Sequence, residues 1–90
     1  NENALGNAVK LYPNPTEGMV TIQLNDEAGK NILVEVYDIT GRKVASQTAE
    51  TTGGSQDMEL NLTEFNGEQV FIIKMTVGDK TGTYKLLKVK

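Results

Sequence analysis

The chain has 90 residues, of which 38% are hydrophobic and 23% charged, with a formal net charge of −3. This length forms one domain, and this composition is that of a folded domain rather than a disordered segment. There are no cysteines and no histidines, which excludes disulfides, Cys/His zinc sites, cysteine nucleophiles and Ser-His-Asp triads. The acidic balance argues against a nucleic-acid partner.

The start of the chain and its hydropathy bear on where the protein resides. No apolar run reaches the roughly 18 residues of a membrane helix, and the N-terminus lacks the pattern of a signal peptide. The small, polar residues 1–8 (NENALGNA) resemble the end of a linker. We therefore expect a chain that does not span a membrane, with residues 9–90 as the domain and residues 1–8 as the end of a linker from an upstream domain.

Short runs of alternating apolar residues predict an all-β domain from the first strands onward. Val9–Tyr12 is predicted as an edge strand that ends at Pro13, because proline fixes φ and removes a backbone donor. Met19–Leu24 follows as a second strand with alternate residues on one face.

The third and fourth strands form a predicted hairpin. Ile32–Tyr37 alternates and runs into Asp38-Ile39-Thr40-Gly41. Asp at the first position caps a type I turn with its carboxylate, and Gly at the fourth supplies the left-handed residue of a G1 bulge. Val44 and Ser46 are then expected to point inward.

The remaining strands complete a predicted sandwich. A glycine loop precedes the alternating strand Met58–Leu62, Phe65 is expected to plug one end of the core, and Val70–Val77 and Thr83–Val89 form the last two strands. Seven strands at this spacing predict a seven-stranded antiparallel immunoglobulin-like β-sandwich. The predicted core residues are Val20, Ile22, Leu24, Val34, Val36, Leu60, Leu62, Phe71, Ile73 and Leu87.

The candidate chemical sites are weak. Asp26-Glu27 is the only adjacent acidic pair and lacks the further oxygen ligands of a calcium loop. Gly53-Gly54 lacks the lysine and helix of a phosphate loop. The triplet Asn61-Leu62-Thr63 matches an N-glycosylation site, but Leu62 is expected to point inward. We predict no catalytic, metal or cofactor-binding residue, and no enzyme.

Charge is unevenly distributed along the chain. Residues 74–90 hold five lysines and one acidic residue, whereas residues 1–73 hold four basic and eleven acidic residues. The C-terminal segment is therefore basic, whereas the rest of the chain is acidic, and this segment is a candidate recognition feature. The alternative is that its lysines only protect an edge strand from aggregation.

Three pieces in order carry a resemblance: LYPNPTEG, VEVYDITGRKV and YKLLKVK. Together they resemble the type A C-terminal sorting domain of the type IX secretion system of Bacteroidetes-type Gram-negative bacteria, over residues 11–90. The matching motif residues are Pro13, Asn14, Pro15, Gly18, Asp38 and Gly41. One departure is that Gly67 precedes Phe71 by four residues, where the family has a spacing of two.

The resemblance implies a non-catalytic, cofactor-free signal attached to an N-terminal cargo. Its implied partners are the outer-membrane translocon with its shuttle proteins, and a sortase-like peptidase that removes the domain. The implied route passes through the periplasm to the cell surface or the medium. The Pro-Asn-Pro corner is expected to switch the chain between sheets, and recognition is expected to centre on Lys85, Leu86, Leu87, Lys88, Val89 and Lys90.

A second interpretation shares the fold. The chain could be a generic immunoglobulin-like spacer, or a carbohydrate-binding module, of a secreted hydrolase, since fold does not decide function. The sequence ends at Lys90, directly after the last predicted strand, and this favours the sorting domain. On the predicted faces, Lys85 lies with Leu87 and Val89, while Lys88 lies near the surface on the other face.

Overall fold

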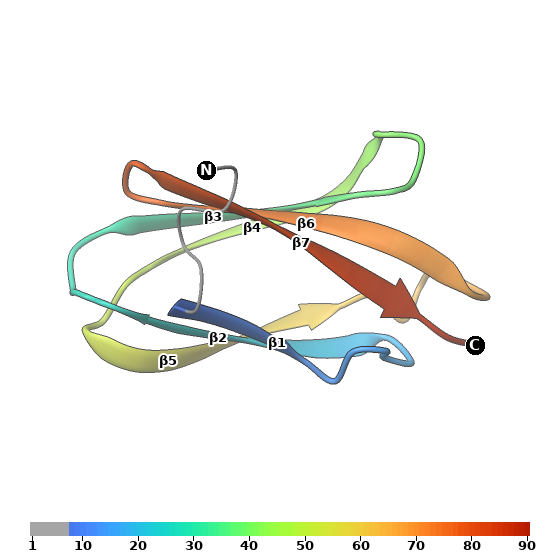
Figure 1. Ribbon diagram of the computed structural model, residues 1–90, viewed down its shortest axis with the longest axis horizontal. Coiled ribbons are helices and arrows are strands. Elements are labelled where there is room, and N and C mark those ends of the chain that lie inside the picture. Colours follow the sequence, from blue (N-terminus) through green and yellow to red (C-terminus); the bar gives the residue numbers. More distant parts are fainter. Residues whose placement is uncertain (1–7) are drawn as a thin grey trace.

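The computed structural model describes residues 8–90, which contain seven β-strands and no α-helix (Figure 1). The strands are β1 (Val9–Tyr12), β2 (Met19–Asp26), β3 (Asn31–Tyr37), β4 (Lys43–Glu50), β5 (Gly54–Asn61), β6 (Gln69–Val77) and β7 (Lys80–Lys88). Among these residues there is no helix that is long and apolar enough to cross a membrane.

The strands form two packed sheets (Figure 1), and every pairing within them is antiparallel. One sheet has the order β1-β2-β5 and the other the order β4-β3-β6-β7. An immunoglobulin sandwich likewise joins its first, second and fifth strands in one sheet and its third, sixth and seventh in the other. The predicted seven-stranded antiparallel β-sandwich is therefore confirmed. The fourth strand, which the constant-type immunoglobulin sandwich places with the first, second and fifth, here pairs with β3.

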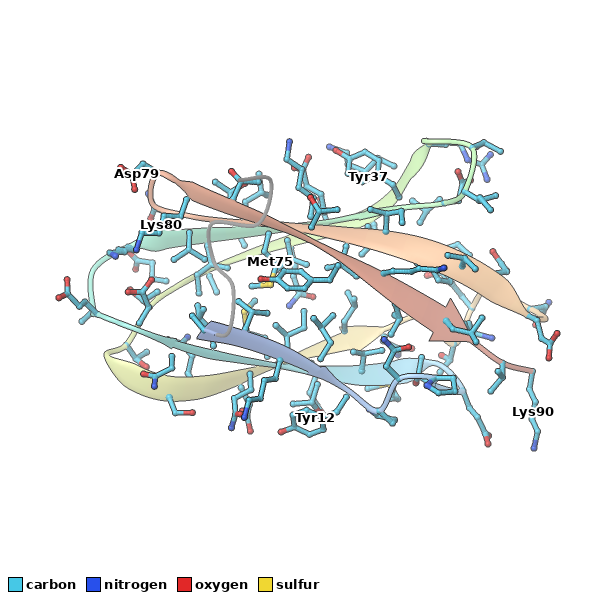
Figure 2. The ribbon with its side chains drawn as sticks, viewed as in Figure 1. Tyr12, Tyr37, Met75, Asp79, Lys80 and Lys90 are labelled. Atoms are coloured by element: carbon cyan, nitrogen blue, oxygen red, sulfur yellow. The ribbon has the colours of Figure 1, made fainter. Side chains whose placement is uncertain are left out.

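The core lies between the sheets, where alternate residues of each strand meet. Nine of the ten predicted core residues are at most 3% exposed: Val20, Ile22, Leu24, Val34, Val36, Leu60, Leu62, Phe71 and Ile73. Met75 lies between the two sheets in Figure 2, also fully buried. The half-buried Phe65 packs edge-on against Phe71, with ring centroids 5.4 Å apart, so the expected plug of the core is present.

The tenth core prediction, Leu87, is wrong. Leu87 is 39% exposed, and its neighbour Leu86 is fully buried instead. The reason is the register with β6, which pairs Phe71 with Leu86 and Val70 with Leu87. Because paired residues share a face of a sheet, the inward side of β6 sets the inward side of β7.

The prediction that Ser46 points inward is also wrong, because Ser46 is exposed. The register between β3 and β4 shifts at Val36/Tyr37, where Val36 pairs with Ala45 and Tyr37 with Lys43. This bulge inserts one residue into β4 and reverses the alternation beyond it. As a result Ala45 and not Ser46 packs against the core, while Val44 packs there as predicted.

Candidate functional site

The three motif pieces converge on one end of the sandwich, here called the motif end: loop 13–18, turn 38–41 and residues 85–90. In Figure 1 the β1–β2 loop, the β3–β4 turn and the C-terminus all lie at this end. The opposite end holds the loops 27–30 and 51–53 and the β6–β7 turn. In Figure 2, Lys90 marks the motif end, and Asp79 and Lys80 mark the opposite end.

The β1–β2 loop binds the exposed edge of β7. The Asn14 side chain donates from Nδ2 to the carbonyl of Lys85 at 3.0 Å and accepts at Oδ1 from the N–H of Leu87 at 3.1 Å. The Thr16 N–H donates to the carbonyl of Leu87 at 2.9 Å, and the Thr16 carbonyl accepts from the N–H of Val89 at 2.8 Å. Four consecutive edge groups of the last strand are thus satisfied by this loop.

The Pro-Asn-Pro corner does not switch the chain between sheets, contrary to the expectation. β1 and β2 are antiparallel neighbours in the same sheet, with Leu11 paired with Ile22. Pro13 and Pro15, which both follow cis peptide bonds, lack the N–H groups that would continue that ladder. Asn14, which lies between the two prolines, instead makes hydrogen bonds to the edge of β7 in the other sheet. The corner therefore holds the two sheets together.

Gly18 is fixed by the packing of this loop against the residues after β5. Its φ of +148° is unfavourable for other residues, and a Cβ there would lie 2.6 Å from Thr63 Cγ2. Its N–H donates to Thr16 Oγ1 at 3.0 Å, and its carbonyl accepts from the Leu62 N–H at 2.8 Å. The glycine of the first motif is therefore required for close approach as well as for backbone conformation.

The turn Asp38–Gly41 has the predicted geometry. The Gly41 N–H donates to the Asp38 carbonyl at 3.0 Å, and Gly41 has a φ of +91°. Asp38 Oδ1 accepts from the Thr40 hydroxyl at 2.6 Å and from the N–H groups of Thr40 and Arg42, both at 3.0 Å. Arg42 Nε lies 3.2 Å from Asp38 Oδ2. The hydrogen bond from the Thr40 hydroxyl, followed by those from the backbone, lowers the pKa of Asp38.

The last strand divides its predicted recognition residues between two faces. Lys85, Leu87 and Lys90 are exposed, Val89 is half-buried, and Leu86 is buried in the core. Lys90 Nζ lies 3.8 Å from Glu17 Oε2 in an exposed ion pair.

Lys88 is 1% exposed, so its predicted place near the surface is wrong. It is buried because it lies two residues after Leu86 and therefore shares the inward face of β7 with that residue. Long aliphatic stems allow lysine to occupy such semi-apolar sites.

The basic segment of the sequence is not one patch in space. Lys85 and Lys90 are exposed at the motif end, whereas Lys80 lies at the opposite end (Figure 2). Sequence reasoning singled out neither Thr16 nor Ile39, although both lie within the quoted motifs. Within residues 8–90 there is no group of three or more His, Cys, Asp or Glu side chains that could hold a metal ion.

Comparison with known proteins identifies the pattern. A family model described as "Secretion system C-terminal sorting domain" matches residues 10–89, a range that includes the first two motif pieces and all of the third except Lys90. No curated protein matches the chain significantly.

Proposed function

The chain belongs to the family of secretion system C-terminal sorting domains, and we propose that it directs an N-terminal cargo through the outer-membrane translocon of the type IX system. Family membership makes the chain a type IX secretion signal, and it implies an exported protein that is secreted or attached to the cell surface. The proposal adds the route through the periplasm and the translocon, with its shuttle proteins, as the receptor.

The observation that supports this proposal best is the convergence of the motif residues on β7. Asn14 and Thr16 bind the backbone of residues 85–89, so the first and last motifs form one surface although they are 71 residues apart. A receptor that recognises a folded surface requires the contacting residues to be held in a fixed arrangement. We propose that recognition centres on the exposed residues of this surface, with Lys85, Leu87 and Lys90 foremost.

The domain itself carries no chemistry in this proposal. Sorting domains are typically not catalysts, and the chain has no cysteine or histidine to act as nucleophile or base. We propose that residues 9–90 form the signal, that residues 1–8 end the linker from the cargo, and that a sortase-like peptidase removes the domain by cutting within or before residues 1–9.

A reporter experiment tests this function. A periplasmic reporter carrying the 90-residue chain at its C-terminus, expressed in a host with the type IX machinery, is expected at the cell surface or in the medium. Mass spectrometry of the exported reporter is expected to place its new C-terminus within or before residues 1–9. A reporter that stays in the periplasm with and without the chain would refute the proposal and favour a spacer module.

A further inference from the structure

An open groove lies beside the last strand at the motif end. Its volume is about 420 Å³, and its lining residues are Asp38, Ile39, Thr40, Glu68, Gln69, Val70 and Leu87. This volume falls within the roughly 300–1,000 Å³ of small-molecule pockets, and it therefore has room for one large apolar side chain. The groove joins the turn of the second motif to the strand of the third.

The groove contains the most exposed large hydrophobic side chain of residues 8–90. Ile39 is 79% exposed, and Leu87, which also lines the groove, is 39% exposed. The turn does not need an apolar residue at position 39, because the Asp38 carboxylate already satisfies the N–H groups of Thr40 and Arg42. Ile39 and Leu87 are exposed in the lining of the same groove, and exposed apolar side chains that lie together mark interaction sites.

The charges around the groove select the kind of partner. Its two charged lining residues, Asp38 and Glu68, are both acidic. Asp38 is already held by Arg42 at 3.2 Å, whereas the exposed Glu68 makes no ion pair within residues 8–90. A partner that placed a carboxylate here would be repelled, and one with a Lys or Arg beside its apolar anchor would be attracted.

We propose that this groove binds a segment of the secretion machinery that inserts one large apolar side chain between Ile39 and Leu87, with an adjacent Lys or Arg facing Glu68. The inference rests on the proposed function, and it extends the recognition surface from β7 to the β3–β4 turn. Leu87 belongs to both parts, since its backbone is bound by Asn14 and Thr16 while its side chain lines the groove. The loop that fastens β7 therefore also fixes one wall of the groove.

Substitutions in exposed positions test the apolar part of the groove. In the reporter experiment, Ile39→Ser and Leu87→Ser are each expected to lower surface or medium reporter about fivefold or more, with an unchanged unfolding midpoint for Ile39→Ser. Tyr12→Ser is the control: Tyr12 precedes the loop 13–18 that contacts β7, is 44% exposed, and points away from the sandwich on the other sheet (Figure 2). It is expected to leave export unchanged.

Two further measurements test the partner. Glu68→Lys is expected to lower export, whereas Glu64→Lys, an equal charge change at an exposed residue outside the groove, is expected to preserve it. A photo-crosslinking residue at position 39 is expected to capture a component of the outer-membrane translocon or one of its shuttle proteins, and the same residue at position 12 is not. Increased export of Glu68→Lys would overturn the assignment of a basic partner.

The failure of this inference is distinguishable from failure of the proposed function. If the parent chain exports the reporter and Ile39→Ser exports it equally well, the groove is not a recognition site although the function stands. If sedimentation shows a dimer that Ile39→Ser dissociates without loss of export, a second copy occupies the groove and the proposed partner is wrong. A parent chain that exports nothing would overturn both.

Discussion

The two ends of the sandwich both fasten loops together, but they do so over very different sequence distances. At the opposite end, Thr51 exchanges hydrogen bonds with Lys30, 21 residues away, and with Gly29. Its N–H donates to Lys30 O at 2.8 Å, its Oγ1 accepts from Lys30 N–H at 2.8 Å, and its carbonyl accepts from Gly29 N–H at 3.1 Å. At the motif end, Asn14 reaches Lys85, 71 residues away.

The surfaces of the two ends differ as well. The loops of the opposite end are polar, with Lys30 Nζ 3.1 Å from Asp26 Oδ1. The motif end exposes Ile39 and Leu87 beside Lys85 and Lys90. We propose that the motif end, besides closing the sandwich, presents these apolar and basic groups to a partner.

The largest expected effect is on the free energy of unfolding, and it differs between a glycine of the motif end and a glycine of the opposite end. Gly18→Ala is expected to destabilise the domain by about 3 kcal/mol, because its Cβ meets the Thr63 side chain at 2.6 Å and its φ is +148°. Gly53→Ala, at the opposite end, keeps an ordinary 3.5 Å contact with Ala28 and carries only the strain of a φ of +91°, about 1 kcal/mol. Urea unfolding of both variants measures the difference, and equal midpoints would contradict it.

Gly41→Val is expected to follow, with a loss of about 1–2 kcal/mol in the free energy of unfolding. Its Cβ meets nothing within 4 Å, so the cost arises only from placing a β-branched residue at a φ of +91°. Thermal unfolding checks this prediction. A variant as stable as the parent would show that the turn adapts, and that Asp38 alone fixes it.

Asn14→Ala is expected to lower the free energy of unfolding by about 1 kcal/mol. It removes both side-chain hydrogen bonds to the edge of β7. Asn25→Ala, at an exposed residue of the opposite end, is the matched control, with an expected change of at most about 0.5 kcal/mol. Faster amide hydrogen exchange at Leu87 in Asn14→Ala would locate the effect, and unchanged exchange there would argue against the fastening role.

The smallest stability effect concerns pH. The pKa of Asp38 is lowered in the folded state, first by the Thr40 hydroxyl, and that of Asp26 is lowered first by the Glu27 N–H and then by Lys30. A lowered folded pKa stabilises the fold above the unfolded value of about 3.9, and this contribution is lost as the pH falls through the folded pKa.

The parent domain is therefore expected to lose stability below about pH 4. Asp38→Asn is expected to lose less over the same range, and Asp26→Asn, at the opposite end, is the matched comparison. Unfolding midpoints between pH 7 and pH 2 measure this. Parallel curves for Asp38→Asn and the parent would show that the turn does not stabilise the ionised carboxylate.

The sequence predicted the strands and most of the core because alternation is strong wherever only one face is apolar. In β2, polar residues separate Val20, Ile22 and Leu24, so their shared face is unambiguous. β7 carries adjacent Leu86 and Leu87, and alternation alone cannot choose between them. Pairing with β6 decides that choice, and this is long-range information.

The candidate site was predictable in its parts but not in its assembly. The Asp38–Gly41 turn is local, and its residue types determine its geometry. The hydrogen bonds from Asn14 and Thr16 to β7 depend on how the two sheets stack, which no local pattern encodes. The bulge beside Val44 was missed because it depends on the register between β3 and β4. The burial of Lys88 was missed because Lys88 shares its face with Leu86, and pairing with β6 decides which face of β7 is inward.

The central claim is that the secretion machinery reads the motif end, and its exposed lysines allow the most direct test. Lys88 is unsuitable because it is buried, whereas Lys85 and Lys90 are exposed. The measurement compares reporter export by Lys85→Glu/Lys90→Glu with that by Lys10→Glu/Lys80→Glu, which makes the same charge change at exposed residues outside the motif end. Both pairs are expected to change stability by at most about 1 kcal/mol. We predict that the reporter with the first pair of substitutions stays folded in the periplasm, whereas the reporter with the second pair is exported normally. Equal export of both reporters would contradict recognition of the motif end through its exposed lysines.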